Sequence, residues 1–307
     1  MSTTSVTNVT LSTRVLKHNL ATQIDTRIED LLDHPELVDE VKRIWQMSPV
    51  IIFRRQLMQE NEQVRFSSMF GECMEIHRKD NVSPYEPKIV YFSTLLYKDG
   101  RPVGAFNNGD EASWHADQTY MARPATGAML YGVEVPRQGG TMAWSDQCAA
   151  YASLPADIKQ LIEGKVGVFR YAKDPNYSEV KANPKVAYGL PDALHEVVIT
   201  HPLTGRKSLY VDPTRLVELQ GLSSADNERV LPILFAAACD PALVYRHTVA
   251  GGDVMLWDNA CTLHQRDPLP LDVPRLMKRT TFYLSPTAHG VPSGSAAGSA
   301  SSASAVC

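Results

Sequence analysis

The sequence predicts a mainly β fold, a sandwich or barrel with α-helices packed around it. Three observations support this prediction. Short β-rich segments recur along the chain and end at turns rich in Gly, Asn and Asp. Helical patterns occur mostly near the start of the chain and in insertions between the strands. The sequence contains neither of the phosphate-binding motifs G-x-G-x-x-G and G-x-x-x-x-G-K-[ST], which are typical of many open parallel sheets.

The first part of the chain predicts two helices around a buried strand. Residues 25–47 carry apolar side chains mostly at three- and four-residue steps, which is the pattern of a helix with one buried face. Pro49 ends this helix, and the apolar residues 50–53 that follow predict a short buried strand. A second helix is expected over 61–69, with Gly71 as its stop signal.

The rest of the chain predicts strands with a few helical insertions. In chain order, the predicted elements are strands at 89–96 and 128–135, short helices at 146–151 and 155–162, a hairpin of 197–200 with 208–211, a helix at 224–239 interrupted by Pro232, and strands at 253–257 and 279–284. This order lacks the regular strand–helix alternation that a doubly wound parallel sheet requires.

A single domain is expected over residues 1–290, with a helical N-terminal part and loops inserted between the strands. Residues 291–307 are almost entirely Gly, Ser and Ala, which bury too little apolar surface to offset the entropy cost of ordering, so a disordered tail is predicted. The five cysteines show no C-x-x-C spacing, so neither a disulfide framework nor a zinc ribbon is expected.

Composition excludes several classes of function. The 307 residues carry 30 Lys and Arg against 34 Asp and Glu, a formal charge of −4, which lacks the basic character of a nucleic-acid-binding domain. No apolar run reaches the roughly 18 to 20 residues that cross a bilayer, and the Ser/Thr-rich start lacks the regions of a secretory signal. The chain is therefore expected in the cytoplasm, with neither a nucleic acid nor a membrane as its partner.

A metal site is the strongest chemical candidate. His115 and Asp117 lie two positions apart, so on an extended backbone both side chains point to one face and can approach one ion. His264 follows the predicted strand 253–257, and a small barrel can bring such a distant residue to the same place. Two histidines and one carboxylate leave open positions on a metal and are typical of non-haem Fe(II) oxygenases. From these residues alone, a surface turn and a core histidine remain the alternatives.

Short blocks of sequence surround this candidate site and are spread over most of the chain. They are residues 50–56 (VIIFRRQ), 70–72 (FGE), 114–120 (WHADQTY), 135–141 (VPRQGGT), 149–151 (AAY), 154–155 (LP), 201–206 (HPLTGR), 252–264 (GDVMLWDNACTLH) and 274–280 (PRLMKRT). In this order they resemble the family of Fe(II)/2-oxoglutarate-dependent dioxygenases that includes taurine dioxygenase and 2,4-dichlorophenoxyacetate dioxygenase. No single block is decisive, but their joint order is specific.

The resemblance implies a double-stranded β-helix, or jelly-roll, core and an iron site formed by His115, Asp117 and His264. It also implies 2-oxoglutarate and O2 as cosubstrates and hydroxylation of a C–H bond, with succinate and CO2 as products. The expected substrate is a small molecule that bears a carboxylate or sulfonate, and hydroxylation beside a heteroatom can lead to cleavage. Relatives are often dimers or tetramers, so a homo-oligomer is expected by analogy.

The far carboxylate of 2-oxoglutarate needs a fixed cation, and arginine suits this role because its planar fork binds a carboxylate bidentately. Arg275 lies eleven residues after His264, where the resemblance places that arginine. Arg279 shares its strand face, and the resemblance places it beside the iron-bound carboxylate and the substrate anion. Met142 stands where the family keeps a threonine at the far carboxylate, so Thr141 takes that role only if the strand slips by one residue.

Residues that select the substrate are expected in loops near the metal site. The resemblance places a substrate-binding histidine close to His77, and Tyr85 and Asn108 are further loop candidates. The polar loops 97–113 and 171–188 have the length of active-site lids, and we expect one or both to order when substrate binds. Ordinary solvated surface is the alternative for each of these residues.

Other functions remain open from the sequence. A zinc hydrolase could use the same three ligands with a bound water, although the chain has no H-E-x-x-H motif. A non-catalytic jelly-roll binding protein could keep the site without turnover. Within oxygenase chemistry, desaturation or another oxidation of a natural-product intermediate is the alternative to hydroxylation. The resemblance disfavours a halogenase, which has a non-coordinating residue in place of Asp117.

Overall fold

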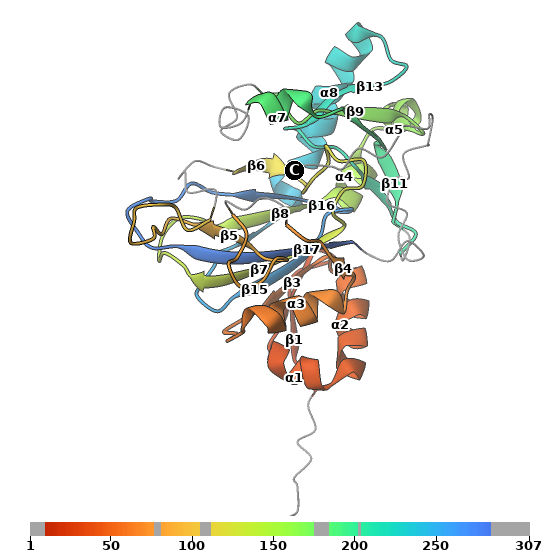
Figure 1. Ribbon diagram of the computed structural model, residues 1–307. Helices are drawn as coiled ribbons and strands as arrows, with labels where there is room; N and C mark the ends of the chain where they lie inside the picture. The colour runs from red at the N-terminus through yellow and green to blue at the C-terminus, as the bar shows by residue number, and fades with distance from the viewer. Residues whose placement is uncertain (1–9, 77–80, 105–111, 175–183, 202–203, 284–307) are drawn as a thin grey trace, which may run out of the picture.

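The computed structural model describes residues 10–76, 81–104, 112–174, 184–201 and 204–283. Within these ranges two sheets pack face to face, helices cover the outer face of the larger sheet, and a mixed helical and β region lies beyond the smaller one (Figure 1). The predicted β sandwich with helical decoration is therefore confirmed, while the predicted tail lies outside the described residues. No helix in this part of the chain has both the length and the apolar composition needed to cross a bilayer.

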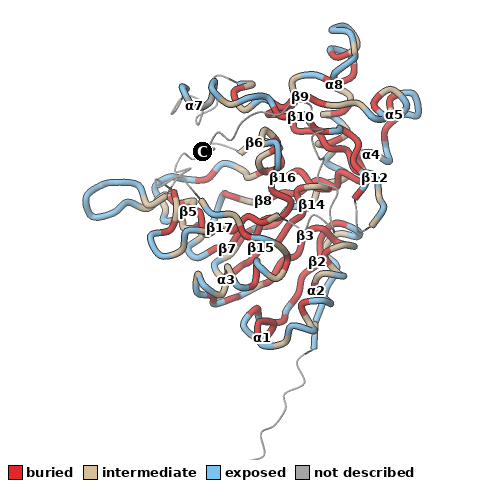
Figure 2. The backbone as a smooth tube through the Cα atoms, turned by 45° about the vertical axis from the view of Figure 1, so that its right-hand side comes forward, coloured by how far each residue is buried: buried red, intermediate tan, exposed pale blue. Residues whose placement is uncertain are grey.

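The larger sheet has the strand order β1-β2-β3-β15-β7-β17-β4, and β5 pairs with β17. Its neighbours are antiparallel except β2 and β3, which run parallel. The central strands are buried on both faces, as their uniformly apolar sequences indicate (Figure 2). The strands are β1 (Thr13–Lys17), β2 (Ala21–Ile24), β3 (Val50–Phe53), β4 (Glu72–Cys73), β5 (Val90–Ser93), β7 (Gly127–Glu134), β15 (Val254–Asp258) and β17 (Leu276–Tyr283).

The smaller sheet is fully antiparallel, in the order β14-β8-β16-β6. Its strands are β6 (Ala112–His115), β8 (Met142–Asp146), β14 (Val244–His247) and β16 (Thr262–Arg266). His264 on β16 lies opposite His115 on β6 and opposite Trp144 on β8. Because directly opposed residues point to the same face of a sheet, these three side chains share the inner face.

The core between the two sheets is apolar and contains side chains from both. Trp144 of the smaller sheet and Trp257 of the larger one lie with ring centroids 6.0 Å apart, and Met277 belongs to the same buried cluster. Inward-facing residues alternate along each strand with residues that face the outer layers, as in other sandwiches with a filled interior. Met277 on the inner face also confirms the expected orientation of the strand that follows Arg275.

Three helices cover the outer face of the larger sheet: α1 (Ile28–Asp33), α2 (Pro35–Met47) and α3 (Glu60–Ser68). Their buried faces pack on outward-facing strand residues such as Phe282, which contacts the ring of Trp45 at 6.1 Å between centroids. Phe282 and Met277 lie on the same strand with opposite orientations, so β17 connects this outer core to the inner one.

Two helix predictions are corrected by the structure. The helix expected over 25–47 is divided at His34, because Pro35 has no N–H to donate and disfavours the helical conformation of the residue before it. Pro35 instead takes the first position of α2, where a missing N–H costs no hydrogen bond. The expected interruption at Pro232 is absent, since α8 (Ser224–Ala238) runs through it as one helix.

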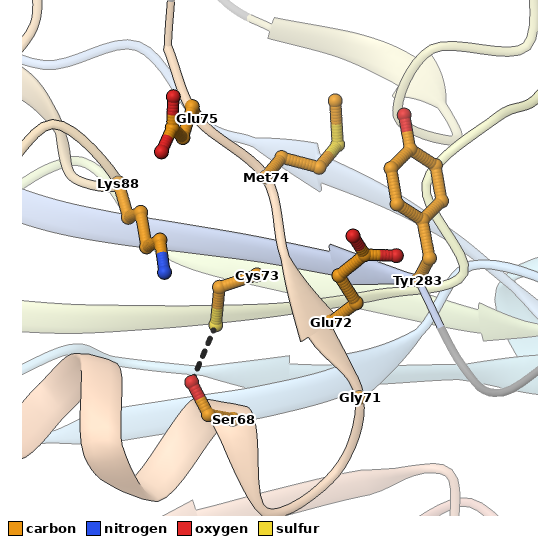
Figure 3. Close-up of a pocket in the computed structure, with 8 residues that line it drawn as sticks. All are labelled: Ser68, Gly71, Glu72, Cys73, Met74, Glu75, Lys88 and Tyr283. Carbon is orange, nitrogen blue, oxygen red and sulfur yellow. Dashed lines mark hydrogen bonds between the residues drawn. The ribbon is translucent and has the colours of Figure 1, made fainter.

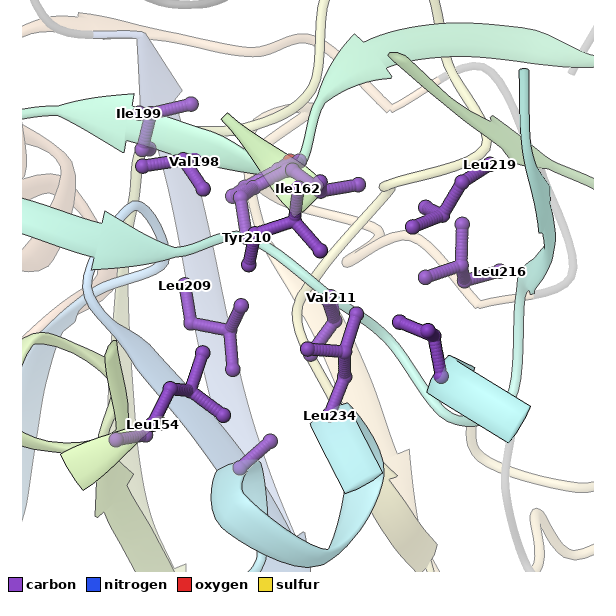
Figure 4. Close-up of a cluster of buried hydrophobic side chains, with 14 of the residues drawn as sticks. Leu154, Ile162, Val198, Ile199, Leu209, Tyr210, Val211, Leu216, Leu219 and Leu234 are labelled. Carbon is purple, nitrogen blue, oxygen red and sulfur yellow. The ribbon is translucent and has the colours of Figure 1, made fainter. Parts of the chain in front are cut away.

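A third apolar cluster lies beyond the smaller sheet (Figure 4). Leu209, Leu216 and Leu234 are among its buried members, and it packs against Leu263, the outward-facing neighbour of His264 on β16. This packing fixes the strand that carries His264 from its outer side. The elements of this region are α4 (Gln147–Ser153), α5 (Ala156–Ile162), β9 (Val166–Phe169), α7 (Pro184–Gly189), β10 (Ala193–Glu196), β11 (Val198–Thr200), β12 (Lys207–Leu209), β13 (Leu216–Leu219), α8 and η1 (Pro241–Leu243).

Gly127 marks a close approach between β7 and β17. A Cβ added there would lie 2.4 Å from Cε2 and 2.5 Å from Cζ of the buried Phe282 ring, so the core would have to shift. We expect Gly127→Ala to lower the free energy of unfolding by about 1–3 kcal/mol, the usual cost of overpacking. Chemical denaturation measures this change. Gly189→Ala is the control, since no atom of the described residues lies within 4 Å of its added carbon. Equal stability of the two variants would contradict the packing described.

Candidate metal centre

The structure brings His115, Asp117 and His264 together. One ligand atom from each lies within 4.8 Å of the other two. His115 ends β6, Asp117 follows in the next turn, and the pairing of β6 with β16 sets the two imidazole rings 4.2 Å apart between centroids. Asp117 and His264 are buried whereas His115 is half-buried, so solvent reaches the cluster at His115.

Neighbouring groups orient these side chains. Nδ1 of His115 lies 2.7 Å from the carbonyl oxygen of Ser113, and since that oxygen only accepts, Nδ1 is assigned the proton and Nε2 keeps a lone pair. The backbone N–H of Asp117 donates to Oδ1 of Asn259 at 3.4 Å, and the same oxygen accepts from Nε1 of Trp257 at 3.0 Å. The ligand-bearing turn after β6 is therefore held by the turn after β15.

The electrostatics of the cluster favour a neutral His264 beside an ionised Asp117. Burial and the nearby His115 lower the pKa of His264 to about 3, so its imidazole is neutral. Burial acts to raise the pKa of Asp117, but the Arg279 cation and the two histidines outweigh burial and hold that pKa below its usual range. Neutral histidines and an ionised carboxylate are the protonation states that a divalent metal requires.

Buried polar atoms that lack a hydrogen-bond partner indicate whether a cation fits between these three side chains. Oδ2 of Asp117 and Nδ1 of His264 have no hydrogen-bond partner among the residues that the structure describes. Buried polar atoms are rarely left unpaired, and a divalent cation would satisfy the carboxylate oxygen. Nitrogen and oxygen donors without sulfur suit Fe(II) and leave coordination positions open. The three side chains therefore fit the metal that the sequence predicts.

Arg279 on β17 contacts this cluster directly. Its Nη1 donates to Oδ1 of Asp117 at 2.7 Å, and its guanidinium carbon lies 4.7 Å from the centroid of the Phe92 ring. Its Nε has no partner within the described ranges. Arg279 thus lies beside the candidate metal-binding carboxylate of Asp117 and keeps one donor available for an anion.

Arg275 is a buried cation that no described carboxylate neutralises. Only 6% of its surface is exposed, and burial followed by the like charge of Arg266 lowers its pKa to about 10. Its backbone is fixed by two hydroxyls, since Ser93 donates to its carbonyl oxygen and Thr94 accepts from its N–H, both at 2.9 Å. A buried arginine fork of this kind is a binding group for a carboxylate ligand.

Thr141 does not take the position that its predicted role requires. It lies one residue before β8 and is half-buried, and its carbonyl oxygen accepts from the N–H of Asp267 at 2.9 Å. Met142 begins β8, is buried and belongs to the core between the sheets together with Trp144. The register of β8 with β16 shows no slip that would exchange the two residues. An apolar thioether therefore replaces the expected hydroxyl on the inner face.

Among the candidates for substrate selection, the resemblance indicates His77, and loop position indicates Tyr85 and Asn108. His77 and Asn108 lie outside the described residues, as do 105–111 and 175–183 of the two predicted lid loops. Tyr85 is described, and its side chain is 85% exposed with no contact to His115, Asp117 or His264. The structure therefore does not bring Tyr85 to the metal cluster.

Sequence reasoning missed the residues that hold the segment after Asp117. Nε2 of the buried His195, on β10, lies 2.9 Å and 3.0 Å from the carbonyl oxygens of Thr119 and Met121. The Thr119 hydroxyl donates to Oδ2 of Asp212 at 2.7 Å. These partners are about 75 to 95 positions apart in sequence, so no local spacing could indicate them.

An open pocket of about 570 Å³ lies at the edge of the larger sheet, apart from the metal cluster (Figure 3). Cys73 of β4, Tyr283 of β17 and Lys88 line it, and no residue of the cluster does. The Ser68 hydroxyl donates to the Cys73 sulfur at 3.4 Å, and burial raises the pKa of that thiol. A protonated thiol of this kind is a poor nucleophile, so the pocket carries no evident chemistry.

Comparison with known proteins gives a consistent result. A family model described as Taurine catabolism dioxygenase TauD, TfdA family, matches residues 12–281. The (S)-phenoxypropionate/alpha-ketoglutarate-dioxygenase of Sphingobium herbicidovorans is 32% identical over 254 residues, which cover 78% of this chain and 83% of that protein. The alpha-ketoglutarate-dependent 2,4-dichlorophenoxyacetate dioxygenase of Cupriavidus pinatubonensis is 30% identical over 261 residues, which cover 80% and 88%. The crystal structure of a taurine dioxygenase from Burkholderia xenovorans matches with a TM-score of 0.74 at 26% identity, over 90% of each chain.

Proposed function

The chain belongs to the taurine catabolism dioxygenase TauD, TfdA family, and we propose that it is an Fe(II) enzyme that hydroxylates a C–H bond of a small anionic molecule. As a member of this family it is an oxidoreductase that uses 2-oxoglutarate. The observation that carries the proposal is the convergence of His115, Asp117 and His264 beside a carboxylate oxygen that has no described partner. The products from 2-oxoglutarate are succinate and CO2.

Three side chains would hold the iron. When bound by His115, Asp117 and His264, Fe(II) supplies the O2 activation that amino-acid side chains cannot provide. The Ser113 carbonyl keeps the proton on Nδ1 of His115, so Nε2 stays free for the metal. Arg279 keeps Asp117 ionised, because its cation opposes protonation of that carboxylate.

Arg275 would bind the far carboxylate of 2-oxoglutarate. Its pKa of about 10 leaves it charged at neutral pH, and its burial excludes the water that would compete for the carboxylate. Met142, which the resemblance aligns with the family's threonine, has no hydroxyl and packs in the apolar core between the sheets. The cosubstrate would therefore depend on the arginine fork more than in relatives that add a threonine.

We infer that the substrate is a phenoxyalkanoic acid. Two relatives that are 30–32% identical over most of the chain are named for phenoxypropionate and 2,4-dichlorophenoxyacetate. Arg279 and Phe92 offer a cation and an aromatic surface side by side near the cluster. Hydroxylation of the carbon beside the ether oxygen gives a hemiacetal. Its C–O bond breaks as the hydroxyl proton passes to the departing oxygen, which yields a phenol and a carbonyl acid.

Two measurements test this function. Anaerobic addition of Fe(II) and 2-oxoglutarate to the metal-free protein should give a weak visible charge-transfer band, which a zinc hydrolase or a binding protein would lack. A panel of phenoxyacetate, both phenoxypropionate enantiomers, taurine and an alkyl sulfate should then give succinate with one substrate class, with phenol released only by the phenoxy acids. A folded protein without the band contradicts the iron assignment, and succinate formed only with taurine or the sulfate contradicts the substrate class.

A further inference from the structure

A second buried cluster of metal-binding side chains lies outside the proposed reaction. One ligand atom from each of His201, Asp258 and Cys261 lies within 4.8 Å of the other two, and each residue is 5% exposed or less. His201 follows β11, Asp258 ends β15, and Cys261 directly precedes β16. Three segments of the fold therefore direct a nitrogen, an oxygen and a sulfur donor to one buried point.

The nitrogen and oxygen donors already have nearly the separation that a small metal ion imposes. Nε2 of His201 lies 3.0 Å from Oδ2 of Asp258. A tetrahedral zinc with bonds of about 2.0–2.1 Å to nitrogen and oxygen holds two such donors about 3.3 Å apart. Nδ1 of His201 accepts the N–H of Thr204 at 3.3 Å, so Nε2 carries the proton that a metal would replace. The other oxygen of Asp258 accepts the N–H of Ala260 at 2.8 Å, which fixes the carboxylate.

A second thiol completes the donor set. Cys148, the second residue of α4, is buried beside this point, and the N–H of its neighbour Gln147 donates to the carbonyl oxygen of Cys261 at 3.0 Å. Cys148 is not among the residues whose donor atoms lie within 4.8 Å of one another, so it would approach the ion from the start of α4 as the fourth ligand. A buried set of one imidazole, one carboxylate and two thiols has the ligand types and the number of a tetrahedral zinc site.

We propose that His201, Asp258, Cys261 and Cys148 bind one Zn(II) ion as a structural site, separate from the iron centre. The two clusters differ in donor chemistry, since only this one contains sulfur, and thiolates select zinc where nitrogen and oxygen donors suit Fe(II). The bound ion links α4, the segment after β11 and the turn between β15 and β16. That turn contains Asn259, which accepts from the backbone of Asp117, and it leads into the strand of His264.

Cobalt substitution tests this proposal with a readout independent of turnover. The full-length chain, with Cys307→Ser to remove the thiol at the chain end, is stripped of metal and titrated anaerobically with Co(II). We expect a near-ultraviolet thiolate-to-cobalt charge-transfer band and two bound metal ions per chain. Zn(II) should abolish this band and raise the Tm. The sulfur-free cluster cannot produce the band, so His115→Ala should retain it even if the proposed iron function fails.

Matched cysteine variants show which thiols give the charge-transfer band. Cys261→Ser and Cys148→Ser should lose or strongly weaken the band, whereas Cys239→Ser, which removes a half-buried thiol elsewhere, should keep it. Circular dichroism confirms that each variant is folded. A folded parent chain that binds Co(II) without the band overturns the proposal. So does a band that survives Cys261→Ser, or a disulfide between Cys148 and Cys261 identified by peptide mapping of the unreduced chain.

Discussion

His115→Ala should remain folded and lose at least about a thousandfold of its 2-oxoglutarate-dependent turnover. A metal ion contributes several kcal/mol of catalysis, and each 1.36 kcal/mol changes the rate tenfold. Removing one of three ligands should weaken or displace that ion. His115 is half-buried, so its truncation leaves a smaller cavity than truncation of the buried His264 would. Succinate formation measures turnover, and the anaerobic charge-transfer band measures assembly of the centre.

The control for this variant is His18→Ala, which removes an exposed imidazole in the turn between β1 and β2. It should keep both turnover and the band. A band of full intensity in His115→Ala would contradict the assignment of this residue as a ligand. Loss of turnover with the band retained would instead point to a role of His115 in positioning the substrate.

Arg275→Gln should weaken 2-oxoglutarate binding by about 30-fold to several-thousandfold. Truncating one partner of a buried charged hydrogen-bonded pair costs about 2–5 kcal/mol, and each 1.4 kcal/mol changes Kd tenfold. The effect should be large in this chain because Met142 offers no second hydrogen bond. Titrating 2-oxoglutarate against the charge-transfer band measures Kd, and the band should reach full intensity at saturation.

Two further variants separate charge from geometry at this position. Arg275→Lys keeps the cation but loses the planar fork, so its affinity should fall between those of the parent chain and Arg275→Gln. Arg229→Gln, which removes an exposed arginine of α8, should leave Kd unchanged. Unchanged affinity in Arg275→Gln would show that another group binds the far carboxylate.

Much of the fold could be predicted because its central strands are buried on both faces. The apolar run 50–53 and the segment 253–257 stand out without any knowledge of their partners, and both form neighbouring strands of the larger sheet. Strand β1 was missed because it is short and has no buried residue, and β2 was missed because the polar residues Thr22 and Gln23 are buried there and break the apolar pattern. Their side chains find partners that lie elsewhere, as in the 2.8 Å bond between the hydroxyls of Thr22 and Ser48.

The site could be predicted only in part, because some residues that form it lie on strands without a clear apolar pattern. The H-x-D spacing indicates two converging ligands because alternate residues of an extended chain share a face. Strand β16, which contains His264 and Gln265, was missed because its buried side chains other than Leu263 are polar and do not give the apolar pattern of a strand. The role predicted for Thr141 depends on a one-residue register, which a pattern of apolar residues does not resolve.

The centre joins two neighbouring strands whose ligands are separated by nearly 150 residues of chain, from Asp117 to His264. Contacts of such long range form late and slowly during folding. If these side chains bind iron as proposed, uptake would require the smaller sheet to have closed, so iron binding would report completed folding rather than assist its early steps. Between these ligands the chain also supplies β7, β8, β14 and β15, so the two sheets and the candidate centre are built from the same stretch of sequence.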